Sequence, residues 1–144
     1  MKIELNRVDN DFHFEAVGST GVPVNIDAAQ AIGGHNKGAR PMELLMMGLG
    51  GCSAIDIVNI LKKQKQQIES FKIIIDAERE KDKTPSIFES VNIHFYLFGN
   101  LDKEKVARAV ELSMEKYCSA AAVIRKSVEI KYSFSVNENL NAEN

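Results

Sequence analysis

The fold is decided by RPMELLMMGLGGC, residues 40–52, in which a proline and a glutamate open a long apolar segment that ends on a cysteine. Pro41 suits the first position of a helix, and Glu43 falls in the first turn, where a negative charge is favourable. Lysines are concentrated over residues 62–65, and positive charge is favoured where a helix ends. These signals predict a helix over about residues 42–66.

This predicted helix has almost no polar face. Between Leu44 and Val58 it is apolar nearly all round, whereas a helix at the surface of a globular protein carries a polar side. One sheet cannot cover such a helix, so we expect a second helix and a partner subunit to cover the rest. The sequence therefore predicts a homodimer.

Three short runs of alternating apolar and polar residues precede the helix. They lie at residues 2–8, 12–16 and 22–28, with turn-forming residues between them. This pattern predicts a three-stranded antiparallel meander with one buried face. The glycine-rich segment at residues 29–41 predicts a mobile loop between the meander and the helix.

After the helix the pattern changes between strand and helix several times. Alternating residues predict strands at 71–79, 91–98 and 128–136. Asp102 is a good N-cap for a second helix, which we expect to run to about Tyr117. The order of three strands, helix, two strands, helix and strand predicts an α+β fold.

Composition limits the class of protein. A chain of 144 residues that is 44% hydrophobic suits one domain, which we place at residues 1–136, followed by a polar tail at 137–144. Twenty acidic and eighteen basic residues give a net charge of -2, which argues against a nucleic-acid partner. No signal peptide is recognisable, and the least polar stretch, Leu44 to Ile55, is shorter than the roughly 20 residues of a membrane span. We therefore expect a cytoplasmic protein with no membrane partner.

The chain has two cysteines, Cys52 and Cys118, and both lie in apolar helical segments. In a reducing cytosol they are expected to be free thiols or a transient redox pair. No C-x-x-C spacing is present, so we expect neither a metal site nor a cofactor. A buried thiol becomes reactive only near a positive charge or a helix N-terminus, and the nearest cations along the chain are Arg40, Lys37 and Arg125.

Three glycines, Gly48, Gly50 and Gly51, lie inside the predicted helix just before Cys52. Each costs about 1 kcal/mol relative to alanine in a helix interior. The missing side chains would let another helix approach, or would leave a hollow beside the sulfur for a substrate. The sequence alone leaves both interpretations open.

The combination of these features resembles the OsmC/Ohr family over about residues 1–136. The resemblance is carried by the strand meander, the glycine-rich loop, Pro41-Met42-Glu43-Leu44 at the helix start, Gly-Gly-Cys52 and, later, Lys116-Tyr117-Cys118-Ser119. It implies an OsmC-like fold, with antiparallel β-sheets packed around two central helices in an intertwined homodimer. It also implies two sites at the subunit interface, each with a pair of cysteines.

The resemblance further implies a peroxidase chemistry. Cys52 would attack a hydroperoxide and become a sulfenic acid, and Cys118 would resolve it as a disulfide that a dithiol reductant later opens. If Ser119 caps a short helix through Ile124, Cys118 stands at a helix start, which is favourable for a thiolate leaving group.

Two positions depart from the pattern of the peroxidase members. Met42 stands where they carry a glutamate directly after the proline, and Glu43 follows one residue later, about 100° around the helix. The peroxidase members also carry an activating arginine on the second strand of the meander. This sequence has no arginine there, so Arg40 is the candidate to take that role. The Pro-Met-Glu-Leu form is similar to the YhfA-type branch of OsmC-like proteins.

Three functions follow from these observations. The first is a peroxidase for organic hydroperoxides that uses Cys52 and Cys118, with Glu43 and Arg40 completing the site. The second is a non-catalytic protein that holds a small lipophilic ligand at the dimer interface, with both cysteines as core residues. The third is a dimeric structural protein without a site.

Overall fold

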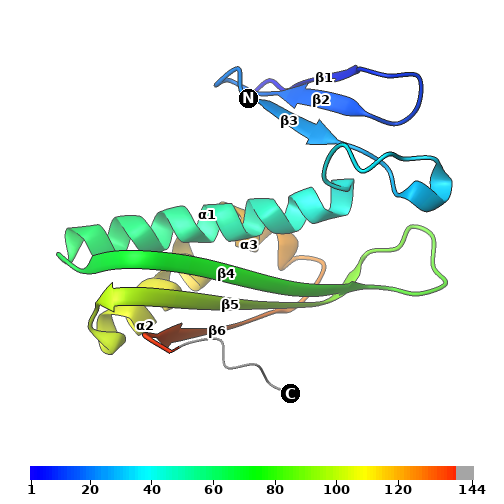
Figure 1. Ribbon diagram of the computed structural model, residues 1–144. Helices are drawn as coiled ribbons and strands as arrows, with labels where there is room; N and C mark the ends of the chain where they lie inside the picture. Colours follow the sequence, from blue (N-terminus) through cyan, green and yellow to red (C-terminus); the bar gives the residue numbers. More distant parts are fainter. Residues whose placement is uncertain (139–144) are drawn as a thin grey trace. The chain divides into compact units, whose positions relative to one another are not determined.

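The computed structural model describes residues 1–138, and the chain divides into two compact units, residues 1–47 and 48–144 (Figure 1). Each unit is described by itself. A single domain over residues 1–136 remains a prediction, and most of the predicted polar tail, residues 137–144, lies outside the described residues.

The first unit contains a three-stranded sheet. Its strands are β1 (Glu4–Arg7), β2 (Phe14–Val17) and β3 (Pro23–Ile26), hydrogen-bonded in that order and antiparallel throughout. The predicted meander is therefore confirmed. Each strand has only four residues, because the turns between them take up several residues of each alternating run.

The loop that follows is held by one buried carboxylate. Asp27 is 1% exposed and accepts hydrogen bonds from the backbone N–H groups of Ala28 at 2.8 Å, His35 at 2.9 Å and Lys37 at 3.1 Å. The loop also contains a short 3₁₀ turn, η1 (Gln30–Ile32). The segment expected to be mobile is thus tied back to Asp27 through the N–H groups of His35 and Lys37.

The second unit contains a sheet with the order β4-β5-β6. Its strands are β4 (Gln67–Arg79), β5 (Phe88–Asn100) and β6 (Ile130–Val136). β4 and β5 are antiparallel, but β5 and β6 are parallel, so the prediction of antiparallel sheets is wrong for this last pair. A helical segment between β5 and β6 carries the chain back to the end where β5 began, which makes the next strand parallel.

The helices match the predicted positions closely. α1 (Pro41–Lys63) is followed after β5 by α2 (Lys103–Leu112), the π-helical turn η2 (Ser113–Tyr117) and α3 (Ser119–Ile124). Asp102 caps α2 as predicted, because its side chain accepts hydrogen bonds from the backbone N–H groups of Glu104 and Lys105. The predicted second helix therefore corresponds to α2 and η2 together, which end at Tyr117.

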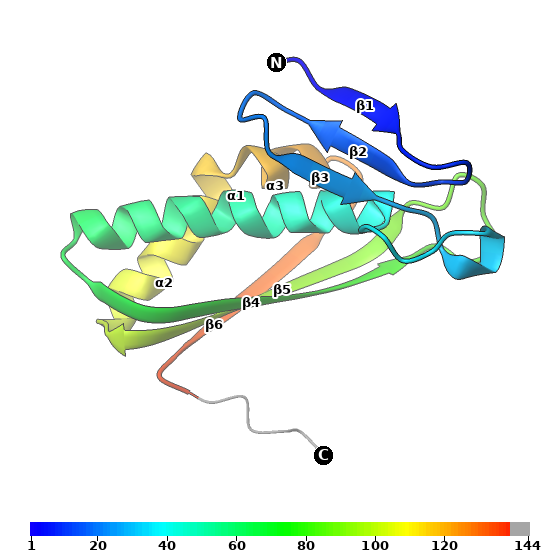
Figure 2. The same ribbon diagram turned by 45° about the horizontal axis from the view of Figure 1, so that its top comes forward.

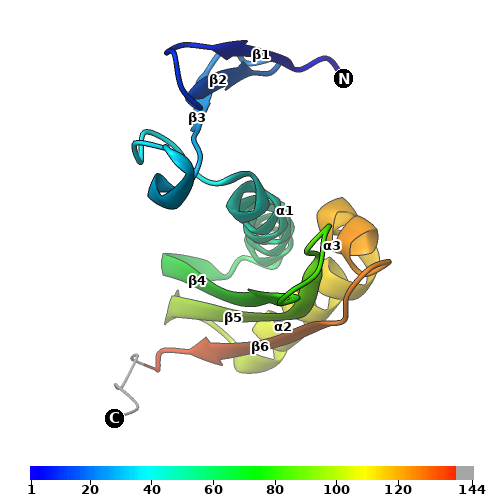
Figure 3. The same cartoon turned by 90° about the vertical axis from the view of Figure 1, so that its right-hand side faces the viewer.

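The core of the second unit lies between its sheet and its helices, which cover one face of the sheet (Figures 2 and 3). Gly50 of α1 lies close to β4, since a Cβ atom there would meet Ile75 Cδ1 at 3.1 Å. Most of the fully buried apolar side chains of this core come from α1, β5 and α2; they include Leu49, Ile57, Leu61, Ile93, Phe95, Leu97, Val106 and Val110.

α1 is longer than the apolar stretch considered in the sequence. With 23 residues, it is long and apolar enough to cross a membrane by length and composition. Its residues Leu49, Ile57 and Leu61 are, however, completely buried within the chain. One side of α1 is therefore part of the core of the second unit.

Candidate functional site

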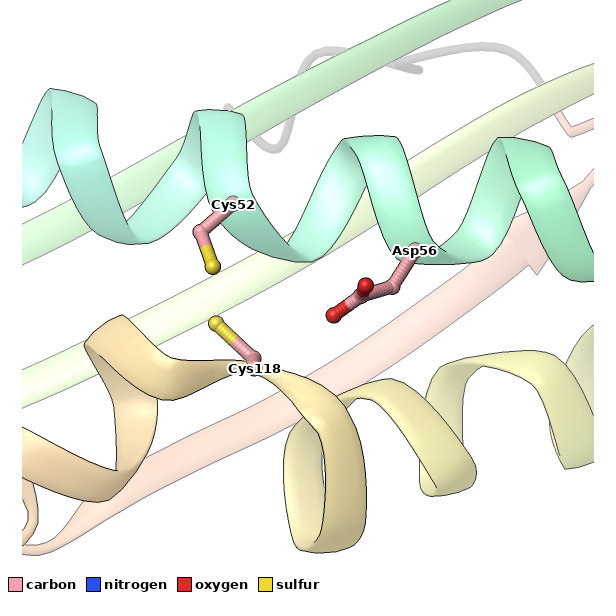
Figure 4. A group of neighbouring side chains, drawn as sticks. All are labelled: Cys52, Asp56 and Cys118. Carbon is pink, nitrogen blue, oxygen red and sulfur yellow. The ribbon is translucent and has the colours of Figure 1, made fainter.

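The two cysteines of the chain meet in the second unit. Cys52 lies on α1 and Cys118 between η2 and α3, and their sulfur atoms are within 4.8 Å of one another. Figure 4 shows the two side chains pointing toward each other. Both are free thiols; Cys52 is half-buried and Cys118 is 3% exposed. The structure therefore brings together the two residues to which the resemblance assigns the redox chemistry.

Cys118 is held by a break in the helical backbone. Its φ of -67° and ψ of 103° are extended, and its N–H donates to the carbonyl oxygen of Ser113 at 2.8 Å. Its sulfur accepts a hydrogen bond from the backbone N–H of Ala121 at 3.4 Å, so Cys118 is the N-cap of α3. The predicted short helix is confirmed, although its cap is Cys118 rather than Ser119.

Burial dominates the electrostatics of Cys118. It raises the pKa of this thiol to about 11, because the thiolate would lose its hydration. The Ala121 N–H lowers the pKa, whereas the neighbouring Cys52 and Asp56 raise it further. Cys118 is therefore a protonated thiol at neutral pH.

Asp56 is the third member of this cluster, and the sequence analysis missed it. It lies one helical turn after Cys52, so the two side chains share a face of α1. One of its carboxylate oxygens is within 4.8 Å of both sulfur atoms, and the carboxylate points toward the pair (Figure 4). The available signal was its spacing of four residues from a cysteine within an apolar helix.

Ser113 positions this carboxylate. Its hydroxyl lies 3.3 Å from Asp56 Oδ2 and 3.2 Å from the carbonyl oxygen of Ser53, and it is completely buried in η2. Two thiols and a carboxylate in this proximity can exchange protons, form a disulfide or ligate a metal ion.

The other two predicted site residues, Arg40 and Glu43, belong to the first unit. The Glu43 carboxylate accepts a hydrogen bond from the Arg40 backbone N–H at 2.8 Å, which caps the start of α1. The Arg40 guanidinium donates to the carbonyl oxygens of Asp27 at 3.4 Å and Gly38 at 3.3 Å, and to Asn36 Oδ1. Within residues 1–138, the hydrogen bonds of both residues are thus made inside the first unit, and their roles toward Cys52 remain predictions.

An open groove in the second unit begins at Asp56. It has a volume of about 560 Å³ and is lined by Asp56, Asn59, Ile60, Lys63, Gln64, Leu112 and Tyr117. It shares Asp56 with the cysteine cluster, while neither Cys52 nor Cys118 is among its lining residues. Its lining is mixed, with Ile60, Leu112 and Tyr117 beside four charged or amide side chains.

Comparison with known proteins agrees with this architecture. The family model described as OsmC-like protein matches residues 34–133. Protein YhfA of Escherichia coli K12 is 43% identical over 102 residues, which are 70% of this chain and 75% of YhfA.

Solved structures extend the similarity to nearly the whole chain. A hypothetical protein from Aquifex aeolicus VF5 superposes with a TM-score of 0.82 and 33% identity, covering 96% of this chain and 97% of that one. The organic hydroperoxide resistance protein OhrB of Bacillus subtilis has the same fold, with a TM-score of 0.64 and 23% identity over 93% of this chain and 96% of its own. The family match spans most of the chain and includes both cysteines, so the protein belongs to the OsmC-like protein family.

Proposed function

We propose that this protein is a thiol-dependent reductase of organic hydroperoxides, with Cys52 as the attacking and Cys118 as the resolving cysteine. The observation that carries the proposal is the approach of the two sulfur atoms to within 4.8 Å inside one chain. Alanine or valine could fill the core at either position, but neither would place two thiols beside each other. Relatives of the same fold named as organic hydroperoxide resistance proteins add support to the reaction class.

In the first step, the Cys52 thiolate attacks the terminal oxygen of the hydroperoxide. A sulfur–oxygen bond forms and the oxygen–oxygen bond breaks, giving a sulfenic acid on Cys52 and an alkoxide that takes up a proton and leaves as an alcohol. The groove beside Asp56 is suited to the organic part of the substrate, because Ile60, Leu112 and Tyr117 give it an apolar wall.

In the second step, the Cys118 sulfur attacks the Cys52 sulfur. A disulfide forms, the sulfur–oxygen bond breaks, and the hydroxide leaves as water with the proton that Cys118 gives up. Asp56 is the group available to accept that proton and pass it on, since its carboxylate is close to both sulfurs. A dithiol reductant then restores the two thiols by exchange.

The working protein is proposed to be a cytoplasmic homodimer. Members of this family are generally homodimers, and the exposed apolar residues of α1, such as Ile55 at 71%, need a cover. Glu43 and Arg40 are proposed to complete the site, with Arg40 supplying the positive charge that favours the Cys52 thiolate.

The test is peroxide consumption by the reduced protein. With cumene hydroperoxide and dithiothreitol, the wild type should turn over, and Cys52→Ser should fall to the rate measured without protein. Cys118→Ser should retain one rapid turnover and accumulate a sulfenic acid that dimedone traps. The oxidised wild type should show a Cys52–Cys118 linked peptide by mass spectrometry. Equal peroxide consumption by the wild type and Cys52→Ser would contradict the proposal.

The role of Arg40 is tested separately. Arg40→Ala should slow the alkylation of Cys52 by iodoacetamide at neutral pH, because the thiolate loses a favourable charge. Lys37→Ala is the matched control, since Lys37 is already paired with Asp9 at 3.3 Å and should have a smaller effect. Unchanged alkylation in Arg40→Ala would end the activating role and leave the peroxidase proposal in place.

A non-catalytic binding protein is the second candidate. The observations that favour it are the groove of about 560 Å³, Met42 in place of the usual glutamate, and the lack of an arginine on β2. In that case the wild type and both cysteine variants would all consume peroxide only at the rate measured without protein. A lipophilic fluorescent probe would bind the wild type and the variants alike.

A further inference from the structure

Cys52, Cys118 and Asp56 bring three possible metal ligands together where the sequence spacing gave no sign of a site. One donor atom from each, two sulfurs and one carboxylate oxygen, lies within 4.8 Å of the other two. We propose that this cluster binds one thiophilic divalent cation, with Zn²⁺ as the ion that its donors match. Figure 4 shows the three side chains converging on a common point from α1 and from the start of α3.

The distances fit such an ion after small side-chain rotations. Zn²⁺ binds sulfur at about 2.3 Å and carboxylate oxygen at about 2.0–2.2 Å, so two sulfurs in a tetrahedral site are about 3.8 Å apart. The observed donors therefore need to close by about 1 Å at most. All three donors are on side chains that already face each other (Figure 4).

The donor chemistry selects the class of cation. Two thiolates and one carboxylate suit borderline-soft ions, whereas Mg²⁺ and Ca²⁺ require shells made of oxygen atoms. Three protein ligands leave the fourth position of a tetrahedral site open for water, as in zinc sites that exchange their ligands. The half-burial of Cys52 and Asp56 leaves a path by which an ion can enter.

The surroundings hold the ligands in place. Ser113 Oγ lies 3.3 Å from Asp56 Oδ2, and the Ala121 N–H donates to the Cys118 sulfur at 3.4 Å. Hydrogen bonds of this kind orient the side chains that bind a metal ion, and losing one typically weakens metal binding about 10- to 100-fold. Ser113 therefore acts as a positioning residue for the proposed site.

Metal binding and redox chemistry would exclude each other. An ion held by both sulfurs keeps them apart as ligands, so neither can attack a peroxide or join the other in a disulfide. Binding displaces the protons of both thiols to solvent, and no electron is transferred. This consequence for activity rests on the proposed function, whereas the binding itself does not.

The experiment is titration of the reduced, full-length protein with Co²⁺ as a spectroscopic stand-in, followed by displacement with Zn²⁺. We expect one ion per chain, sulfur-to-cobalt charge-transfer bands in the ultraviolet and the visible bands of a tetrahedral site. Cys52→Ser and Cys118→Ser should each lose the charge-transfer intensity, and Asp56→Asn should weaken binding at least about 10-fold. Glu129→Gln, which removes an exposed carboxylate, is the matched control and should bind as the wild type does.

Further variants separate ligation from folding. Asp56→His offers another zinc ligand and should restore affinity lost in Asp56→Asn, while Ser113→Ala should weaken binding about 10-fold. Binding that persists in both cysteine variants, or that is equal in Asp56→Asn and Glu129→Gln, would overturn the site. The titration contains no peroxide, so its result does not depend on whether the protein is a peroxidase.

Discussion

At the scale of single residues, the chemistry depends on how the proton of Cys118 is removed. Burial keeps this residue a thiol at neutral pH, and a thiol is a poor attacking group compared with a thiolate. Asp56 can act in two opposite ways here. Its negative charge disfavours the Cys118 thiolate, yet its carboxylate is placed to accept the proton during attack on the Cys52 sulfenic acid.

The variant Asp56→Asn distinguishes these two effects. If the carboxylate acts as the base, disulfide formation after a peroxide pulse should slow about 100-fold at neutral pH. If it acts only as a charge, the variant should resolve faster, because the pKa of Cys118 falls when the charge is removed. Quenched samples analysed by mass spectrometry report the loss of two hydrogens with time, and Glu129→Gln provides the control.

At the scale of elements, the loop before α1 depends on Asp27. Three backbone N–H groups donate hydrogen bonds to its carboxylate and lower its pKa from the ordinary value of 3.8 to about 2. The hydrogen bond from the Lys37 N–H is the largest cause. This carboxylate joins the end of β3 to residues that are up to ten positions further along the chain.

We predict that this link is lost in acid and in Asp27→Asn. Because the folded pKa is depressed, its stabilising effect is complete above about pH 4 and disappears as the pH falls toward 2. In the variant, the free energy of unfolding should lose this part of its pH dependence, and the melting temperature at pH 7 should be lower. The amide hydrogens of His35 and Lys37 should exchange faster. Asp76→Asn removes an exposed carboxylate and should leave these amides unchanged; equal exchange in both variants would contradict the role of Asp27.

The elements show what the sequence could and could not predict. Caps and periodicity found α1, α2 and the first sheet, because local signals such as Asp102 act within a few residues. The direction of β6 was missed, since alternation is the same in parallel and antiparallel strands. Asp56 was missed because its importance arises from Cys118, which is distant in sequence and which only the fold brings to it.

At the scale of the whole molecule, one face of α1 in the second unit lacks a cover. Gly48, Gly51 and Ile55 follow each other along this face at helical spacing, and the side chain of Ile55 is 71% exposed. Within residues 48–138, no atom outside the neighbouring backbone of α1 itself lies within 4 Å of a Cβ atom added at Gly48 or Gly51. Contacts within the described part of the second unit therefore do not explain these two glycines, each of which costs about 1 kcal/mol in a helix.

A partner helix close to this face would explain them, and Gly51→Ala tests the idea through the sign of its effect. In a monomer, the added methyl group would meet open space and stabilise α1 by about 1 kcal/mol. In a dimer packed at this face, the methyl group would crowd the partner at a cost of about 1–3 kcal/mol and raise the dimer dissociation constant about 5- to 100-fold. Sedimentation equilibrium should therefore find a wild-type dimer that Gly51→Ala weakens, while Lys62→Ala, an exposed change in the last turn of α1, leaves it intact. Two results would contradict an interface at this face of α1. One is a wild-type protein that is a folded monomer at micromolar concentration, and the other is a Gly51→Ala variant that is more stable and equally dimeric.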